Sequence, residues 1–281
     1  MRQSRGIFVK IDNAIIGVDD KKCYQQLWPD VARIWNILGV TPRLYWVTNS
    51  KENFPYPSPY GTITKLPILP MYSRGFLWGE EQCSGYESML ARMYGCATAS
   101  GVNILADIDM FPLSRRFFID NLEIYKPDQM IILGASFEYF IMGHRFSSNY
   151  HVGKNTSFAK MIYLQRAPAW DVGYVQDAQR CTLEAQERDP QPWMDELHTF
   201  EYNDEYYLFQ KLMTWVNDEN NSAVILPRWR GKRVVLANLS ENFDALITGG
   251  IDAHFRATEI TDFDLVHRFA DKVYERLTNY R

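Results

Sequence analysis

The stretch Asn103-Ile-Leu-Ala-Asp107-Ile-Asp109-Met-Phe-Pro112-Leu113 decides the expected fold class. Residues 102–106 predict a buried parallel strand, so Asp107 and Asp109 should emerge on one side of its C-terminal end. Ligands bind at that edge of open α/β sheets. Two neighbouring carboxylates repel each other unless a cation lies between them. The pair therefore indicates a hard divalent metal, Mg²⁺ or Mn²⁺, which takes oxygen ligands and shares them with a substrate's phosphates.

The residues before this couplet alternate between strand and helix patterns. Strands are expected at 14–18, 43–48 and 62–69, and helices at 29–39 and 85–100. Such alternation predicts an α/β fold with a mostly parallel sheet, right-handed crossovers and flanking helices.

The pattern is less regular after the couplet. Further strands are expected at 130–134 and 161–164, and helices at 204–216 and 264–277. The polar stretch 166–200 predicts irregular structure, as in a lid or a second half-domain.

Composition limits the possible functions. The chain has 281 residues, of which 46% are hydrophobic and 23% charged, as in an ordinary globular protein. A net charge of −4 without a basic block argues against a nucleic-acid partner. No signal sequence and no transmembrane segment are predicted. Four scattered cysteines fit free thiols in a reducing compartment, so a cytoplasmic location is expected.

The couplet and its surroundings resemble the metal-binding motif of nucleotide-sugar glycosyltransferases of the GT-A fold. The resemblance implies that Asp109 ligates Mn²⁺ or Mg²⁺ on the donor's diphosphate. Asp107 would reach the ribose or, through water, the metal. It also implies a single GT-A-like, Rossmann-type domain over 1–281 with a C-terminal acceptor-side helical region. Residues 1–113 would form the nucleotide-sugar-binding half and residues 114–281 the acceptor-side half.

The residues after the first strand are similar to the first β-α-β unit of such enzymes, in which this loop cradles the base and ribose. Val18, Asp19, Asp20 and Tyr24 are the candidates here. A carboxylate of Asp19 or Asp20 would bind ribose hydroxyls, and Tyr24 would stack on the base. The same Asp-Asp-Lys-Lys run also fits a plain turn. Arg92 would face the diphosphate, or it is a solvated helix residue.

Asn203-Asp204-Glu205 looks like the acidic motif that begins a helix beneath the acceptor site in inverting members of the family. One carboxylate there would take the acceptor's proton, with Asp204 preferred over Glu205. The alternative is a helix N-cap followed by acidic residues that favour the helix dipole.

Three further residues complete the set of candidates. His267 resembles the late histidine that completes the metal site or touches the diphosphate in this fold, although a partly buried helix histidine is an equal alternative. His151 and Lys154 lie where such enzymes run a strand past the donor sugar. No other catalytic motif is recognisable.

The sequence thus predicts a metal-dependent and inverting glycosyltransferase with a UDP-sugar donor and a glycan or glycoprotein acceptor. It looks most like small soluble enzymes of bacteria or of large algal viruses. A viral enzyme would act in the host cytoplasm. Xylose as the donated sugar is suggested by the viral analogy alone. The alternatives are a phosphatase of the haloacid dehalogenase type and a non-catalytic sugar-binding module. The phosphatase motif normally closes the first strand of its domain. The sequence leaves the acceptor, the linkage and the oligomeric state open.

Overall fold

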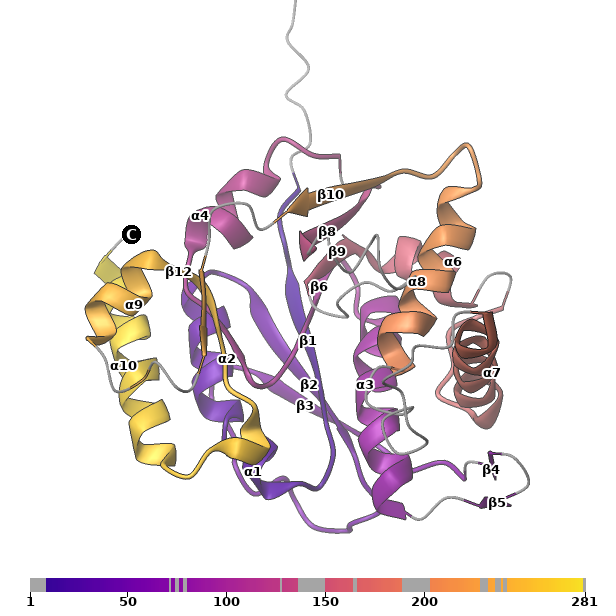
Figure 1. Cartoon of the computed structure of the whole chain (residues 1–281), viewed down its shortest axis with the longest axis horizontal. Helices are drawn as coiled ribbons and strands as arrows, with labels where there is room; N and C mark the ends of the chain where they lie inside the picture. The colour runs from indigo at the N-terminus through magenta and orange to yellow at the C-terminus, as the bar shows by residue number, and fades with distance from the viewer. Residues whose placement is uncertain are drawn as a thin grey trace, which may run out of the picture.

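The computed structural model describes residues 9–279 except 71, 74, 75, 78, 79, 127, 136–149, 164, 165, 189–202, 228–231, 236–238, 240 and 241. A seven-stranded sheet in the order β10-β8-β9-β6-β1-β2-β3 forms its centre (Figure 1). The strands are β1 (Asn13–Val18), β2 (Thr41–Val47), β3 (Thr62–Leu66), β6 (Val102–Ala106), β8 (Met130–Ala135), β9 (His151–Lys154) and β10 (Ala223–Pro227).

Strand β9 runs antiparallel to β6 and β8, and the other pairs in this sheet are parallel. The expected α/β class with a mostly parallel sheet is therefore confirmed. The sheet includes strands from both 1–113 and 114–281, so the two parts of the chain share one hydrogen-bonded layer.

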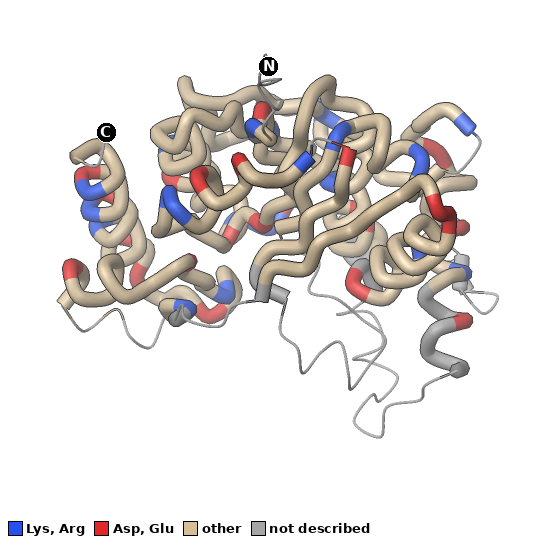
Figure 2. Tube along the Cα trace, turned by 90° about the horizontal axis from the view of Figure 1, so that it is seen from above, with Lys and Arg blue, Asp and Glu red and all other residues tan. Residues whose placement is uncertain are grey.

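Helices cover both faces of the sheet (Figure 1). One face packs against α2 (Trp28–Ile37) and α10 (Phe263–Asn279). The other packs against α3 (Glu80–Thr98), α6 (Asn155–Tyr163), α7 (Val172–Arg188) and α8 (Asn203–Val216). Because side chains alternate along a strand, Ala14, Ile16 and Val18 of β1 enter the first core while Ile15 enters the second. Seen from above, the inner strands carry few charges, whereas the C-terminal helix carries both signs (Figure 2).

A second sheet joins distant parts of the chain. It has the order β11-β12-β7, with β7 (Met110–Pro112) following the couplet directly and β11 (Lys232–Val235) and β12 (Gly250–His254) coming from the end of the chain. The remaining elements are short: β4 (Tyr72–Ser73), β5 (Phe76–Leu77), α1 (Lys22–Gln25), α4 (Arg115–Phe118), α9 (Phe243–Gly249), and 3₁₀ turns at Asp120–Leu122 and Ala257–Glu259.

Most expected elements are present with shifted ends, and two expectations after the couplet are wrong. Residues 161–163 belong to helix α6, because Phe158, Met161 and Ile162 form a helical stripe that buries against the second core. Residues 172–188, expected to be irregular, form helix α7, and Tyr174, Ala178 and Cys181 supply its buried face. Within the described part of the chain, no helix is long and apolar enough to cross a membrane.

A buried amide network fixes the start of β6 against β1 and α3. Asn103, which has no exposed surface, donates from Nδ2 to the carbonyl oxygens of Cys96 and Ala99 at 2.8 and 2.7 Å. Its Oδ1 accepts from Nδ2 of Asn13 at 2.8 Å. Asn103 therefore satisfies carbonyl groups at the C-terminal end of α3 that would otherwise be buried without a partner.

Replacing this side chain with an apolar one of similar size tests the network. We expect Asn103→Leu to lower the free energy of unfolding by about 3 kcal/mol, because several buried polar groups lose their partners. Urea unfolding measures the change. Asn36→Leu, at an exposed position of α2, is the matched control. Equal losses in the two variants would contradict the role given to Asn103.

Candidate functional site

The couplet lies at the carboxyl edge of β6, as its sequence predicts. Strand β6 ends at Ala106, and the backbone then turns, with the N–H of Met110 donating to the carbonyl of Asp107 at 3.4 Å. The two carboxylates therefore do not continue the alternation of a strand. Asp107 is contacted from α3 and Asp109 from β12, which corrects the expectation that both project from one side of an extended strand.

Asp107 forms an ion pair with Arg92 of α3, whose side chain is only 5% exposed. The helix can lie this close because Gly17 of β1 has no side chain: a Cβ there would stand 1.9 Å from the carbonyl oxygen of Ser88. Arg92 is therefore a buried residue that faces the couplet, not a solvated helix arginine. Its guanidinium offsets part of the repulsion between the two carboxylates, which the sequence-based prediction had a metal ion offset.

Asp109 is 8% exposed, and its Oδ2 lies 3.7 Å from Nε2 of His254. His254 comes from β12, which pairs with β7 so that His254 stands opposite Met110. The N–H of Phe255 donates to the carbonyl of Asp109 at 2.9 Å, which fastens the end of β12 to the couplet. His254 was not among the site residues predicted from the sequence. Apolar Ile251, Ala253 and Phe255 alternating with Asp252 and His254 are the strand signal that could have found it.

His267, expected to complete a metal site, is placed elsewhere. Its Nδ1 contacts the carboxylate of Asp30 on α2, and its side chain is 42% exposed. Within the described part of the chain no contact joins His267 to either aspartate of the couplet. The structure thus does not support the metal role, and the late histidine beside the couplet is His254.

The loop after β1 gives different surroundings to its two aspartates. Both oxygens of Asp20 are engaged, one by Nε1 of Trp46 at 2.8 Å and the other by Oγ1 of Thr48 at 2.7 Å. Asp19 is 4% exposed, accepts the backbone N–H of Lys21 at 3.0 Å, and has a raised pKa because of burial. Asp20 therefore holds the loop to β2, which leaves Asp19 as the candidate for ribose binding.

Two other candidates flank this loop. Val18 is the last residue of β1, and its side chain is buried in the first core, so only its backbone is available to a ligand. Tyr24 lies in α1, is half-buried, and packs against that core.

The proposed base lies at the start of α8. Strand β10 runs parallel to β8 and begins at the amino edge of the sheet, shortly after α8 ends at Val216. The 14 residues of α8 extend about 21 Å, so its first turn lies towards the carboxyl edge (Figure 1). Glu205 is half-buried there, and the side chain of Asp204 lies outside the described part of the structure.

The two candidates on β9 lie at opposite ends of that strand. Lys154 stands opposite Val102, at the amino end of β6, roughly 17 Å from Asp107 at about 3.3 Å per residue. His151 lies at the other end of β9 but has no exposed surface. Direct contact with a donor sugar, expected for both, is therefore not supported by their positions.

The metal expectation can be tested against the donors present. Among the described residues, no group of three or more His, Cys, Asp and Glu side chains could hold a metal ion. Arg92 binds Asp107, so Asp109 is the carboxylate available to a cation. One or two carboxylates suffice for Mg²⁺ when waters and substrate phosphates supply the other ligands. The donors fit a cation of this kind.

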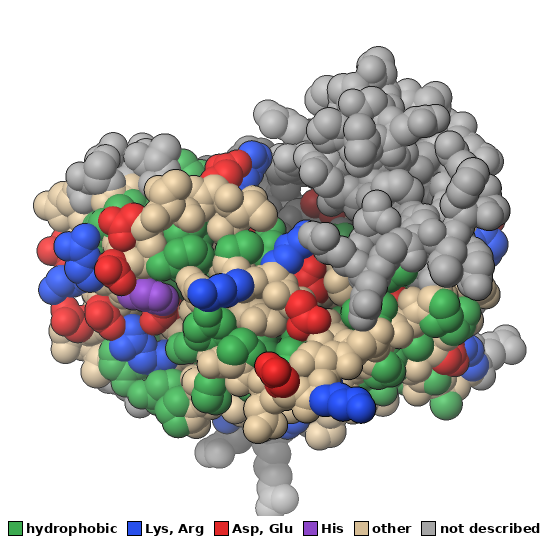
Figure 3. Space-filling model, turned by 90° about the horizontal axis from the view of Figure 1, so that it is seen from below, with side chains coloured by type: hydrophobic (Ala, Val, Ile, Leu, Met, Phe, Trp, Pro, Cys, Tyr) green, Lys and Arg blue, Asp and Glu red, His purple; other side chains and the backbone are tan. Residues whose placement is uncertain are grey.

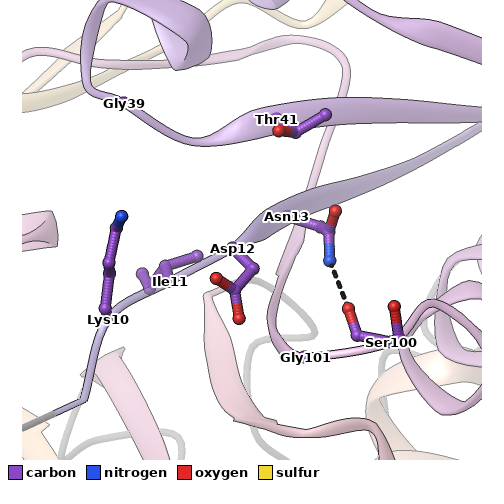
Figure 4. A pocket seen from close by; sticks show the side chains of 8 residues that line it. All are labelled: Lys10, Ile11, Asp12, Asn13, Gly39, Thr41, Ser100 and Gly101. Atoms are coloured by element: carbon purple, nitrogen blue, oxygen red, sulfur yellow. Dashed lines mark hydrogen bonds between the residues drawn. The ribbon is translucent and has the colours of Figure 1, made fainter.

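The face of the molecule on the side of α1 is mixed in character. Figure 3 shows the molecule from the side on which α1 lies, with acidic and basic side chains standing among apolar ones. A polar hollow of about 420 Å³ lies at the opposite, amino edge and is lined by Lys10, Ile11, Asp12, Asn13, Gly39, Thr41, Ser100 and Gly101 (Figure 4). Its position separates it from the couplet, so it does not belong to the candidate site.

A buried carboxyl group supports the segment that follows β3. Glu87 of α3 has no exposed surface, and its two oxygens accept from the N–H of Leu69, each at 3.0 Å. Burial raises the pKa of Glu87 from its ordinary 4.5 to about 8, and the hydrogen bond from Leu69 offsets part of the rise. The protonated form is therefore favoured in the folded chain at neutral pH.

This raised pKa makes stability depend on pH. The contribution of Glu87 is fully present below pH 4.5 and is lost as the pH rises towards about 8, because the unfolded chain releases the proton first. We expect Glu87→Gln to gain stability relative to the wild type between pH 5.5 and 8.5, by roughly 3 kcal/mol. Denaturant unfolding at both pH values measures this gain. Glu219→Gln, at an exposed position, is the control and should show no such gain. A stability difference between Glu87→Gln and the wild type that is the same at both pH values would refute the raised pKa of Glu87.

Comparison with known proteins adds a likeness of low similarity. A galactosyltransferase, LgtC, in complex with donor and acceptor sugar analogues has a TM-score of 0.46 and 8% identity over 95% of each chain. A glycosyltransferase of Streptococcus pneumoniae TIGR4, GlyE in its apo form, has a TM-score of 0.43 and 8% identity over 97% of this chain and 63% of its own. No protein-family profile and no curated protein sequence match. Likenesses at these scores establish neither the family nor the reaction.

Proposed function

We propose that this chain is a metal-dependent glycosyltransferase that moves a sugar from a UDP-sugar to a hydroxyl group of a glycan or glycoprotein. The observation that carries the proposal is the couplet at the carboxyl edge of β6, with Arg92 on one side and His254 on the other. Open α/β sheets bind nucleotides at this edge. The end of β1, with Asp19 buried beside α3, lies at the same edge.

The residues of the chain divide the work as follows. Asp109 would hold the cation, which neutralises the diphosphate leaving group when bound. Asp107, kept in place by Arg92, would accept a hydrogen bond from the ribose or from a water on the metal. Asp19 would bind the ribose and Tyr24 would stack on the base. Mn²⁺ or Mg²⁺ suits this arrangement because both prefer oxygen ligands.

The proposal includes an inverting reaction, which is supported by the resemblance of the acidic start of α8 to the motif of inverting enzymes. Asp204, or Glu205 in its place, would take the proton of the acceptor hydroxyl as the sugar is attacked. A single displacement of this kind needs no nucleophile from the protein. Xylose as the donated sugar, and an origin among bacteria or large algal viruses, rest on the sequence resemblance alone.

The phosphatase alternative is less favoured by the geometry. It would require Asp107 as the nucleophile, but the ion pair with Arg92 draws charge from that carboxylate. The couplet also follows β6, after β1, β2 and β3, and not the first strand of the chain. A sugar-binding module without turnover predicts donor binding with no product, so detection of a transferred sugar separates it from the proposal.

The metal role is tested by Asp109→Ala. We expect loss of sugar transfer and at least tenfold weaker UDP binding in the presence of Mn²⁺, because the carboxylate between the cation and the protein is lost. Thermal shift with a panel of nucleotide sugars and Mn²⁺ measures binding and also identifies the donor. The control is Asp128→Ala, an exposed position before β8. Full activity of the wild type in excess chelator would refute the metal role.

The base is tested by Asp204→Asn. Transfer should stop while donor binding stays near normal, because the substitution removes a proton acceptor but keeps the shape of the side chain. Initial rates and donor affinity measure the two effects. Asp264→Asn is the matched control. Asp264 lies in the first turn of α10, so its substitution also removes a negative charge that interacts favourably with a helix dipole. Continued turnover in Asp204→Asn would assign the proton transfer to Glu205 or another group.

A further inference from the structure

The ring of His254 contacts an ion pair on the side away from Asp109. Arg233 of β11 stands opposite Asp252 of β12, and its Nη2 and Nε donate to the two carboxylate oxygens at 3.1 and 3.4 Å. Asp252 has no exposed surface. The same guanidinium places Nη1 3.3 Å from Nδ1 of His254. A buried carboxylate thus fixes the cationic group that contacts the histidine.

This contact determines which ring nitrogen carries the proton. A guanidinium has only N–H donors and cannot accept a hydrogen bond, so Nδ1 of a neutral His254 must accept. The ring proton is then on Nε2. That nitrogen is the one 3.7 Å from the carboxylate of Asp109. His254 therefore presents an N–H group, and not a lone pair, to the couplet.

A metal-ligating histidine needs the opposite arrangement. Its ligating nitrogen offers a lone pair, while the other nitrogen donates its N–H to a carboxylate, a carbonyl or water. Here the second nitrogen faces a donor. Arg233 consequently opposes ligation of a cation by His254.

We propose that Arg233, held by Asp252, is a positioning residue that keeps His254 as an N–H donor towards Asp109. A divalent cation alone then finds one available carboxylate, so it binds weakly until the diphosphate arrives with its own oxygen ligands. The inference rests on the proposed function for the identity of the ligand. On this inference the site binds the cation and the diphosphate together as one complex. His254 then donates a hydrogen bond and does not ligate the cation.

Binding of Mn²⁺ alone tests this role. We expect Arg233→Met to bind Mn²⁺ about tenfold more tightly than the wild type, because the Nε2 lone pair becomes available and a positive charge is lost. Electron paramagnetic resonance of free Mn²⁺ measures the affinity. Arg233→Met leaves Asp252 buried without its cation, so the double variant Arg233→Met/Asp252→Asn removes both members of the pair. A purely structural role predicts weaker or unchanged binding, and that result in both variants overturns the proposal.

Arg256→Met is the matched control. Arg256 lies close in sequence to His254, is exposed, and pairs with Glu259, so it tests the loss of one charge without loss of the contact to the ring. An equal increase in Mn²⁺ affinity in this variant overturns the proposal. The proposal is also overturned if the increase persists when Asp109→Ala is added to Arg233→Met, because the cation would then bind at another site.

The proton on His254 is read directly by nitrogen NMR of the metal-free protein at pH 8, where an ordinary imidazole is neutral. The signal is assigned with His254→Gln, since the chain has five histidines. A proton on Nε2 supports the inference, and a proton on Nδ1 in the wild type overturns it. Neither readout requires turnover. Failure to transfer any sugar would therefore count against the proposed function while the role of Arg233 is judged separately.

Discussion

The pairing of β7 with β12 is the contact on which the candidate site depends. It joins Met110–Pro112, directly after the couplet, to residues more than 130 positions later in the chain, and the N–H of Phe255 reaches the carbonyl of Asp109. Without it, His254 and the Arg233–Asp252 pair would have no fixed relation to the carboxylates. Backbone hydrogen bonds supply this relation, so the side chains are placed by a rigid element and not by a loop.

The two carboxylates of the couplet have neighbours that differ in charge. Two aspartates stand one residue apart, and each has a different neighbour: a buried guanidinium beside Asp107 and an imidazole beside Asp109. The first carboxylate is thereby neutralised within the protein. The second has no guanidinium partner among the described contacts, and the proposed cation would bind there. The spacing alone indicates a symmetric pair of equal ligands, whereas the structure gives the two carboxylates different neighbours.

The sheet makes this division possible. Parallel strands buried on both faces bring the ends of β1 and β6 to one edge, while α3 packs close enough over Gly17 for Arg92 to reach that edge. The buried amides of Asn13 and Asn103 hold the other end of the same strands. Contacts from α3 thus reach both ends of β6: Arg92 pairs with Asp107 just beyond its carboxyl end, and the carbonyls of Cys96 and Ala99 accept from Asn103 at its start.

The sequence by itself determined the class of fold, the couplet at the end of β6 and the helices at both ends of the chain, because hydrophobic periodicity and turn residues are local signals. The prediction of a strand at 161–163 was wrong because a short apolar run does not distinguish a strand from a buried helical turn. The prediction of irregular structure over 172–188 was wrong because polar residues separate the buried positions of helix α7. The tertiary structure decided which late histidine meets Asp109. Local pattern can place His254 on a strand and His267 on a helix, but only the pairing of β12 with β7 brings one of them beside the couplet. The tertiary structure also distinguished Asp20 from Asp19. Trp46 and Thr48, from the neighbouring strand β2 and the residue after it, bind Asp20, and the spacing of residues in the sequence does not predict this contact.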